Sequence, residues 1–208
     1  MPRVSDTRAR ILRAAEDVVV RDGVSHLTLE AAASEANVSK GGVLYHFPTR
    51  AALVSAMVQR FAESFDADLE RYGAGSGQPG AFTRAYLEST VAPTVEPDDP
   101  RERRLGGALL AGLASDPELL APLRERFDAW QAAVERDGLA PGRATLVRLA
   151  ADGLWLADLL GLAPVEGVER EKVAAALRAL VTTGATETAG GRGRPVRARG
   201  ATARRGRG

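Results

Sequence analysis

The sequence has no cysteine, only two histidines (His26 and His46) and only two lysines, so 26 of its 28 basic residues are arginine. The lack of cysteine excludes disulfides and thiolate metal sites, and two histidines are too few for a histidine-rich metal centre. We therefore expect no metal and no other cofactor. No apolar run approaches the roughly 20 residues of a membrane helix, and the N-terminus lacks the apolar segment of a targeting signal. These absences predict a cytoplasmic protein without a membrane partner.

Motifs of the common enzyme classes are also missing. No nucleophile has a base beside it, and the glycine-rich stretch from Gly73 to Gly80 lacks the Lys-Ser/Thr ending of a phosphate loop. We therefore expect no enzyme and no catalytic residue. Hydrophobic residues make up 45% of the 208 residues, which is enough for a proper core, so a binding function remains.

Charge is distributed unevenly along the chain. Residues 1–50 carry a net charge of +1, residues 51–187 carry −7, and residues 188–208 carry +7. An acidic body argues against coating of nucleic acid by the whole surface, and it leaves the two ends of the chain to face DNA. The Gly/Arg-rich segment 185–208 is expected to be disordered. It either strengthens nonspecific attraction to DNA or has no role, and both alternatives stay open.

The stretch from Thr28 to Leu53 predicts two short helices joined by a tight turn. Thr28 can cap the first helix, because a hydroxyl at this position accepts from the unpaired backbone N–H groups of the opening turn. Asn37 stands where the chain must turn and tolerates the left-handed conformation. Ser39 offers a second cap for a helix from Lys40 to about His46. This spacing is that of a helix-turn-helix motif.

The second of these helices has the composition of a DNA-reading element. Lys40, Gly41 and Gly42 give its N-terminus a cation and little bulk, which suits close approach to a phosphate backbone and to base edges. Tyr45 and His46 carry hydrogen-bonding tips at its far end. Packing of these two side chains at the end of a small domain is the structural alternative.

The run from Arg8 to Leu53, including TLEAAASEANVS and VLYHFPTRAAL, resembles the DNA-binding domain of TetR/AcrR-family transcriptional regulators. Asn37 replaces the glycine that this family commonly has at the turn. The resemblance implies double-stranded operator DNA as a partner. It places base-edge contacts and nearby phosphate contacts on Ser39, Lys40, Gly41, Gly42 and Val43. It places backbone phosphate contacts on Thr28, Tyr45, His46 and Arg50, although Arg50 could be only a solvated charge.

The remaining periodicity predicts an all-α fold of about nine helices. A first helix capped by Ser5 or Asp6 and ended by Gly23 covers the motif. Thr49 caps a helix of about six turns that joins the DNA-binding domain to the rest of the chain. We expect a three-helix DNA-binding domain at 1–48, a larger helical domain at 49–184 for effector binding and dimerisation, and the tail at 185–208. The last helix is expected to stop at Gly184.

Apolar residues of the larger domain are most simply core residues. In the family that the run from Arg8 to Leu53 resembles, however, the same helices enclose an effector pocket. The resemblance therefore implies a pocket for an apolar or amphipathic small molecule lined by Met57, Phe61, Leu109, Leu113, Phe127 and Trp130. Arg148 and Asp152 lie four residues apart near Trp155. They fit either a ligand-facing group or an exposed ion pair beside a dimer contact, and we favour the exposed ion pair.

The last two helices have more apolar surface than one packing partner requires. This surplus favours a four-helix bundle formed with a second subunit, similar to the dimers of the TetR family, over a single monomeric core. The expected homodimer contacts are Leu149, Leu156, Leu160, Val173, Leu177 and Leu180.

These observations predict a ligand-responsive transcriptional regulator, with repression as the family default. It would bind a (pseudo)palindromic operator as a homodimer and be released by a small-molecule effector. Two alternatives are a nonspecific nucleic-acid-organising protein that uses the arginine-rich tail, and a small-molecule carrier with a vestigial DNA head. Comparing the affinities for specific and competitor DNA would distinguish the first alternative from a sequence-specific regulator.

Overall fold

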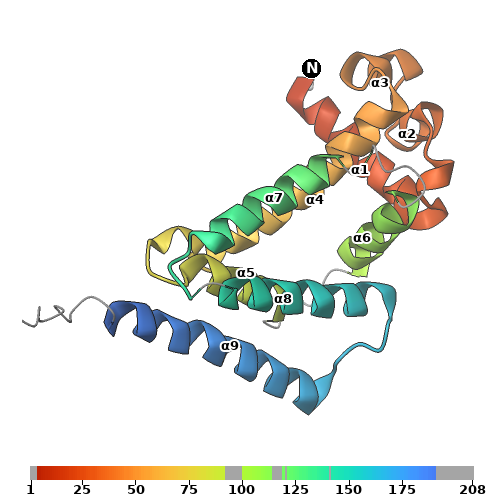
Figure 1. Cartoon of the computed structure of the whole chain (residues 1–208). Helices are drawn as coiled ribbons and strands as arrows, with labels where there is room; N and C mark the ends of the chain where they lie inside the picture. Colours follow the sequence, from red (N-terminus) through yellow and green to blue (C-terminus); the bar gives the residue numbers. More distant parts are fainter. Residues whose placement is uncertain (1–3, 92–99, 114–118, 120, 141, 191–208) are drawn as a thin grey trace, which may run out of the picture.

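The computed structural model describes residues 4–91, 100–113, 119, 121–140 and 142–190 (Figure 1). Within these ranges the chain forms nine α-helices and two short 3-10 helices, with no strand. The predicted all-α class is thus confirmed. None of the helices in the described ranges is both long enough and apolar enough to cross a lipid bilayer.

The head consists of α1 (Val4–Asp22), the 3-10 turn η1 (Val24–His26), α2 (Leu29–Glu35) and α3 (Lys40–His46). The Oγ1 of Thr28 accepts from the Ala31 N–H at 3.0 Å, and the Oγ of Ser39 accepts from the Gly42 N–H at 3.1 Å. Asn37 has a φ of 50°, in the left-handed region. Both predicted caps and the predicted turn are therefore present.

The start of α1 differs from the prediction. The helix already includes Val4, so Ser5 and Asp6 lie in its first turn and neither residue caps it. Asp6 still places a negative charge near the positive end of the helix dipole, which is favourable there. Gly23 ends the helix as expected, with a φ of 86° that suits glycine.

Helix α4 (Arg50–Arg71) runs from the head along the whole body (Figure 1). The Oγ1 of Thr49 caps it, accepting from the Ala52 N–H at 3.0 Å. Its buried residues Leu53 and Met57 belong to the same apolar cluster as Phe47 of the head and Leu109 of α6 (Pro100–Leu113). One continuous core therefore crosses the domain boundary that we predicted between residues 48 and 49.

A buried charge reinforces this connection. The Glu16 side chain on α1 is only 3% exposed. Its carboxylate lies 3.6 Å from the Nε of Arg60 on α4 and 3.4 Å from an Nη of Arg101 on α6. The same Arg101 nitrogen pairs with Asp17 at 2.7 Å. Loss of its arginine partners would leave the Glu16 carboxylate buried without a compensating charge, so this residue ties α1 of the head to α4 and α6.

The body is completed by α5 (Ala81–Val91), α7 (Ala121–Glu135), α8 (Arg143–Leu160) and α9 (Gly167–Gly190). Residues of these helices and of the second half of α4 form the other apolar cluster. Asp137 caps α5 from a distance, because its two carboxylate oxygens accept from the backbone N–H groups of Phe82 and Thr83 at 3.1 and 2.7 Å. Nothing in the local sequence around Ala81 indicated this cap.

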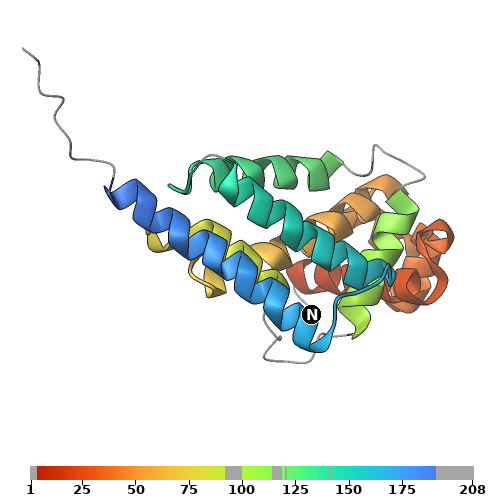
Figure 2. The ribbon, with the colours of Figure 1, turned by 60° about the horizontal axis from the view of Figure 1, so that its bottom comes forward.

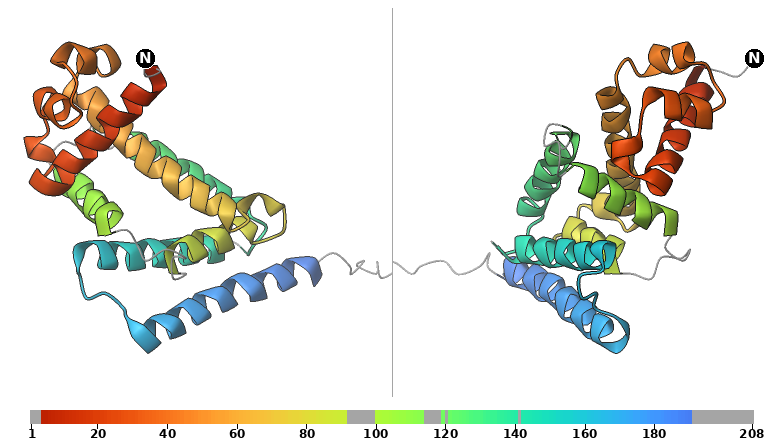
Figure 3. Two further views of the ribbon diagram at one scale, coloured as in Figure 1. Left: turned by 180° about the vertical axis from the view of Figure 1, so that it is seen from behind. Right: turned by 90° about the vertical axis from the view of Figure 1, so that its right-hand side faces the viewer.

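Helices α8 and α9 run side by side on the face of the body remote from the head (Figures 2 and 3). Helix α9 continues through Gly184 to Gly190, so its predicted end at Gly184 is wrong. A glycine inside a helix costs roughly 1 kcal/mol relative to alanine and does not by itself end a helix. The disorder predicted for 185–208 therefore does not apply to 185–190, and 191–208 lie outside the described residues.

Candidate DNA interface and ligand pocket

The outward face of α3 presents most of the residues that the sequence assigned to DNA. Ser39, Lys40 and Gly41 are exposed, and Tyr45 is the most exposed of the large apolar residues, at 77%. The Tyr45 and His46 rings meet edge to face with centroids 5.0 Å apart. The tyrosine hydroxyl therefore stands at the surface, supported by a neighbouring ring.

The amine of Lys40 contacts a carboxylate of α2. Its Nζ lies 2.5 Å from the Oε1 of Glu30, and this contact lowers the pKa of the Glu30 carboxyl. Both side chains are more than half exposed, and such surface pairs contribute little to stability. Lys40 can therefore exchange Glu30 for a phosphate at small cost.

Val43 does not fit the predicted base-edge contact. Its side chain is completely buried and packs inside the head. Base readout needs an exposed side chain, so the buried Val43 side chain is not placed to contact a base edge. The next residue, Leu44, is 40% exposed and was missed. Val43 is the one buried residue of α3, and a helix of seven residues is too short for its buried face to be clear from periodicity in the sequence.

Arg50 makes two hydrogen bonds inside the head. Its Nε donates to the carbonyl of Leu27 at 2.8 Å, and its Nη2 donates to the carbonyl of Val24 at 2.7 Å. The side chain is half-buried by this arrangement, so it is not simply a solvated charge. Arg50 thus joins the first turn of α4 to the turn that precedes α2 and α3. These two bonds use Nε and Nη2, so the predicted phosphate contact of Arg50 would have to come from Nη1.

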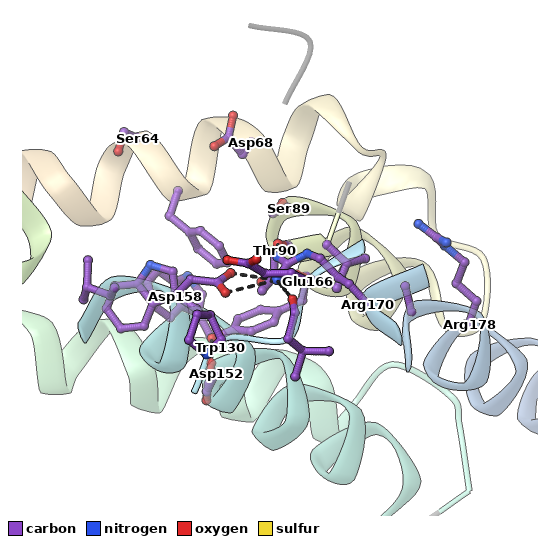
Figure 4. Close-up of a pocket in the computed structure, with 18 of the residues that line it drawn as sticks. Ser64, Asp68, Ser89, Thr90, Trp130, Asp152, Asp158, Glu166, Arg170 and Arg178 are labelled. Atoms are coloured by element: carbon purple, nitrogen blue, oxygen red, sulfur yellow. Dashed lines mark hydrogen bonds and ion pairs between the residues drawn. The ribbon is translucent and has the colours of Figure 1, made fainter. Parts of the chain in front are cut away.

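A cavity of about 730 Å³ lies in the body between α4, α5, α7, α8 and α9. This volume lies within the range of sites that enclose drug-sized molecules. Six aromatic side chains line it: Phe61, Phe65, Tyr86, Phe127, Trp130 and Trp155. Figure 4 shows the lining, with Trp130 and Asp152 on one side and Ser64 and Asp68 of α4 on the other.

The structure brings half of the predicted pocket residues to this cavity. Phe61, Phe127 and Trp130 line it. Met57 and Leu109 do not, because both are buried in the core shared by the head and α6. Leu113 ends α6, and its side chain lies outside the described residues. The sequence showed that these residues share helix faces, but it could not show which end of each face is sealed by the head.

The aromatic rings support one another at the cavity wall. Phe65 meets Trp130 and Tyr86 edge to face, with centroids 4.9 and 5.0 Å apart. Phe127 meets Trp130 at 5.0 Å in the same manner. The Nε1 of Trp130 donates to the Oδ1 of Asp66 at 2.8 Å, so its polar edge is satisfied. These contacts hold the rings of the wall against one another.

The pair Arg148 and Asp152 is not the exposed ion pair that we predicted. The Asp152 carboxylate faces the cavity, accepts from the Tyr86 hydroxyl at 2.7 Å and pairs with Arg148 at 2.6 Å. Arg148 also donates to Gln131 of α7 at 2.7 Å. Burial raises the pKa of Asp152, and burial together with the Asp152 charge raises the pKa of Tyr86. This half-buried network connects α5, α7 and α8.

Arg170 forms a second polar connection at the other end of the cavity. Its Nη1 lies 2.8 Å from Asp158 of α8 and donates to the carbonyl of Val165, while its Nη2 donates to the carbonyl of Thr90. Figure 4 shows the Arg170 guanidinium facing Asp158, with Glu166 beside them. The start of α9 is thereby attached to α8 and to the end of α5.

The predicted dimer residues fall into two groups. Leu149, Leu156 and Leu160 of α8 are exposed, whereas Leu177 of α9 is buried in the body. Val173 and Leu180 also pack partly against that core. The sequence missed Leu146, which is exposed in line with the α8 leucines, because it treated all apolar positions of the helix as one wide face.

Family models match both parts of the chain. The model of bacterial regulatory proteins of the tetR family matches residues 11–57. The model of the tetracyclin repressor-like C-terminal domain matches residues 80–182. The two matches thus include the head with its α3 helix and most of the body, but not the part of α4 after residue 57 that forms one wall of the cavity.

Individual relatives agree with these matches. The regulator TtgR of Pseudomonas putida is 38% identical over 61 residues, which span 29% of this chain and 29% of its own length. The multidrug binding protein EbrR, solved in complex with malachite green, is 26% identical with a TM-score of 0.65, over 83% of this chain and 96% of its own. A TetR-family member from Streptomyces coelicolor A3 is 25% identical with a TM-score of 0.64, over 84% of this chain and 98% of its own. The chain therefore belongs to the TetR family of transcriptional regulators.

Proposed function

We propose that this protein is a repressor that binds a (pseudo)palindromic operator as a homodimer and is released by a small molecule in the cavity. The observation that carries the proposal is the course of α4. Its first half is buried in the core beneath α3, and Phe61 and Phe65 in its second half line the cavity. One helix thus touches both the DNA-reading head and the ligand site.

Contacts to DNA are divided between the base edges and the phosphates. Ser39, Lys40, Gly41 and Leu44 of the exposed α3 face are placed to meet base edges and nearby phosphates. Leu44 suits the methyl group of a thymine. Gly42 lets the backbone approach DNA because it carries no side chain. A Cβ there would stand 3.4 Å from the Oγ of Ser39, in ordinary contact with the capping side chain. Thr28, Tyr45 and His46 meet backbone phosphates, which hold the head in register.

The first prediction concerns the Tyr45 hydroxyl. Tyr45→Phe should weaken binding to all DNA sequences alike, by about 1 kcal/mol for one lost hydrogen bond. Tyr72→Phe is the matched control, because Tyr72 ends α4 at the far side of the body and should leave DNA affinity unchanged. Titration of operator and competitor DNA with each variant checks this. A Tyr45→Phe protein with an altered sequence preference and full overall affinity would contradict the phosphate assignment.

Dimerisation is proposed to use the exposed stripe of α8. Leu146, Leu149, Leu156 and Leu160 are all exposed, and Gly153 in their middle has open space around it. Spacings of three and four residues place these positions in one seam along the helix, as in packed helix pairs. A row of exposed leucines favours burial against a second subunit, because isolated exposed leucines are common but continuous patches are not. A monomer would leave this stripe in water.

The second prediction separates the stripe from the core. Leu149→Arg and Leu156→Arg should give folded monomers, since each places a charge in the proposed interface at a side chain that is exposed in the single subunit. Leu177→Arg should instead unfold the protein, because Leu177 is buried within the subunit. Light scattering and circular dichroism distinguish the two results. Intact dimers from both stripe variants would remove α8 from the interface.

Release by a ligand requires that the ligand prefer an arrangement that cannot bind the operator. Two heads must match half-sites about 34 Å apart, so a small tilt of α4 disturbs both contacts together. A tenfold loss of operator affinity needs about 1.4 kcal/mol of coupling. The complexes of EbrR with malachite green and ethidium support a small molecule as the occupant of the corresponding region here.

The third prediction tests the coupling. Small molecules that raise the melting temperature of the protein should lower its affinity for the operator at least tenfold. Each hit from a thermal-shift screen is followed by operator titration with and without a saturating amount of the compound. Hits that stabilise the protein and leave operator affinity intact would favour the carrier alternative. Equal affinity for operator and competitor DNA would favour the nonspecific nucleic-acid-organising alternative.

A further inference from the structure

The charges around the cavity do not balance. Five carboxylates and two guanidiniums belong to its lining: Asp68, Asp152, Asp158, Glu166 and Glu171, with Arg170 and Arg178. Three of the carboxylates are already neutralised by arginines, because Asp68 pairs with Arg71 at 2.9 Å, Asp152 pairs with Arg148 at 2.6 Å and Asp158 pairs with Arg170 at 2.8 Å.

Glu166 and Glu171 remain without a partner. Among the described residues, no hydrogen bond or ion pair holds either side-chain carboxylate. Both belong to the segment that enters α9 and both line the cavity, and Figure 4 shows Glu166 beside Asp158 and Arg170. The lining therefore carries an excess of two negative charges.

An anionic ligand would find no available cation in this lining. Arg170 is engaged with Asp158 and with the carbonyls of Val165 and Thr90. Arg178 makes two bonds of 2.7 Å to the carboxylate of Glu88. A negatively charged molecule would therefore have to break an existing ion pair and would still meet Glu166 and Glu171.

The aromatic wall has the opposite preference. The faces of tryptophan, tyrosine and phenylalanine rings carry negative potential and attract a cation that lies within about 6 Å of the ring centroid. Phe61 and Trp155 line the cavity with centroids 6.2 Å apart and an interplanar angle of 39°, so they are not stacked face to face on each other. A flat cation gains from both the rings and the unpaired carboxylates.

From these charges and rings we infer that the effector is a flat aromatic cation, with Glu166 and Glu171 selecting its charge and the aromatic wall selecting its shape. The inference rests on the proposed role of the cavity as the effector site. It adds the chemical class of the ligand, which follows neither from the size of the cavity alone nor from its aromatic content alone.

Two xanthene dyes of opposite charge provide the test. Rhodamine 6G is a cation at neutral pH and fluorescein is an anion, while their fused ring systems are alike. Both tryptophans of the chain, Trp130 and Trp155, line the cavity. Quenching of intrinsic tryptophan fluorescence therefore reports its occupancy. We expect rhodamine 6G to bind at least tenfold more tightly than fluorescein, with a smaller ratio as salt is added.

The variants assign this preference to residues. Glu166→Gln with Glu171→Gln should reduce rhodamine 6G affinity about tenfold, or about threefold for each lost charge, and should strengthen fluorescein binding. Glu169→Gln is the matched control, because Glu169 lies between them in sequence, pairs with Lys172 and is not part of the lining. It should change neither affinity. All three glutamates are exposed, so the variants should fold normally.

The outcomes distinguish this inference from the proposed function. Equal affinity for the two dyes, or an unchanged preference in the double variant, overturns the cation inference. Either of these results leaves the proposed function standing if one of the dyes weakens operator binding. Absence of quenching by both dyes overturns the inference as well. A cation preference without loss of operator affinity upholds the inference and contradicts the release mechanism.

Discussion

Helix α4 packs into two different environments, and the rest of the structure depends on this packing. Leu53, Val54 and Met57 are fully buried beneath the DNA-reading helices, while Phe61 and Phe65 face the cavity one turn or more further along. A helix of 22 residues is about 33 Å long and spans both environments without a break. In the proposed function, a ligand that moves its second half also moves the head.

Two polar contacts keep this rod attached to the head and oppose slippage between them. Arg50 at its start bonds to the carbonyls of Val24 and Leu27, and Arg60 near its middle approaches the buried Glu16. Arg101 brings α6 to the same carboxylate. Apolar surfaces alone can slide, whereas charged groups with fixed partners have few alternative positions. The head and the upper part of α4 are therefore expected to move as one unit.

The sequence predicted what depends on local chemistry. Caps at Thr28, Ser39 and Thr49 and the left-handed Asn37 follow from residues within three positions, and all are present. Features that depend on tertiary contacts were missed. Val43 and Leu44 are neighbours with opposite exposure, Asp152 turns from an expected surface pair into a cavity group, and Leu177 is internal although it follows the same pattern as the exposed leucines of α8. Periodicity identifies a helix face but not its partner.

The central claim is that a ligand in the cavity re-aims the two heads of a dimer. The absence of cysteine allows one spin label per subunit, introduced by Ser34→Cys on the exposed side of α2. Electron double resonance on the labelled protein then measures the distance between the two heads directly. We predict one distance maximum without ligand and a different maximum at a ligand concentration that abolishes operator binding. An unchanged distance distribution at that concentration would contradict the account.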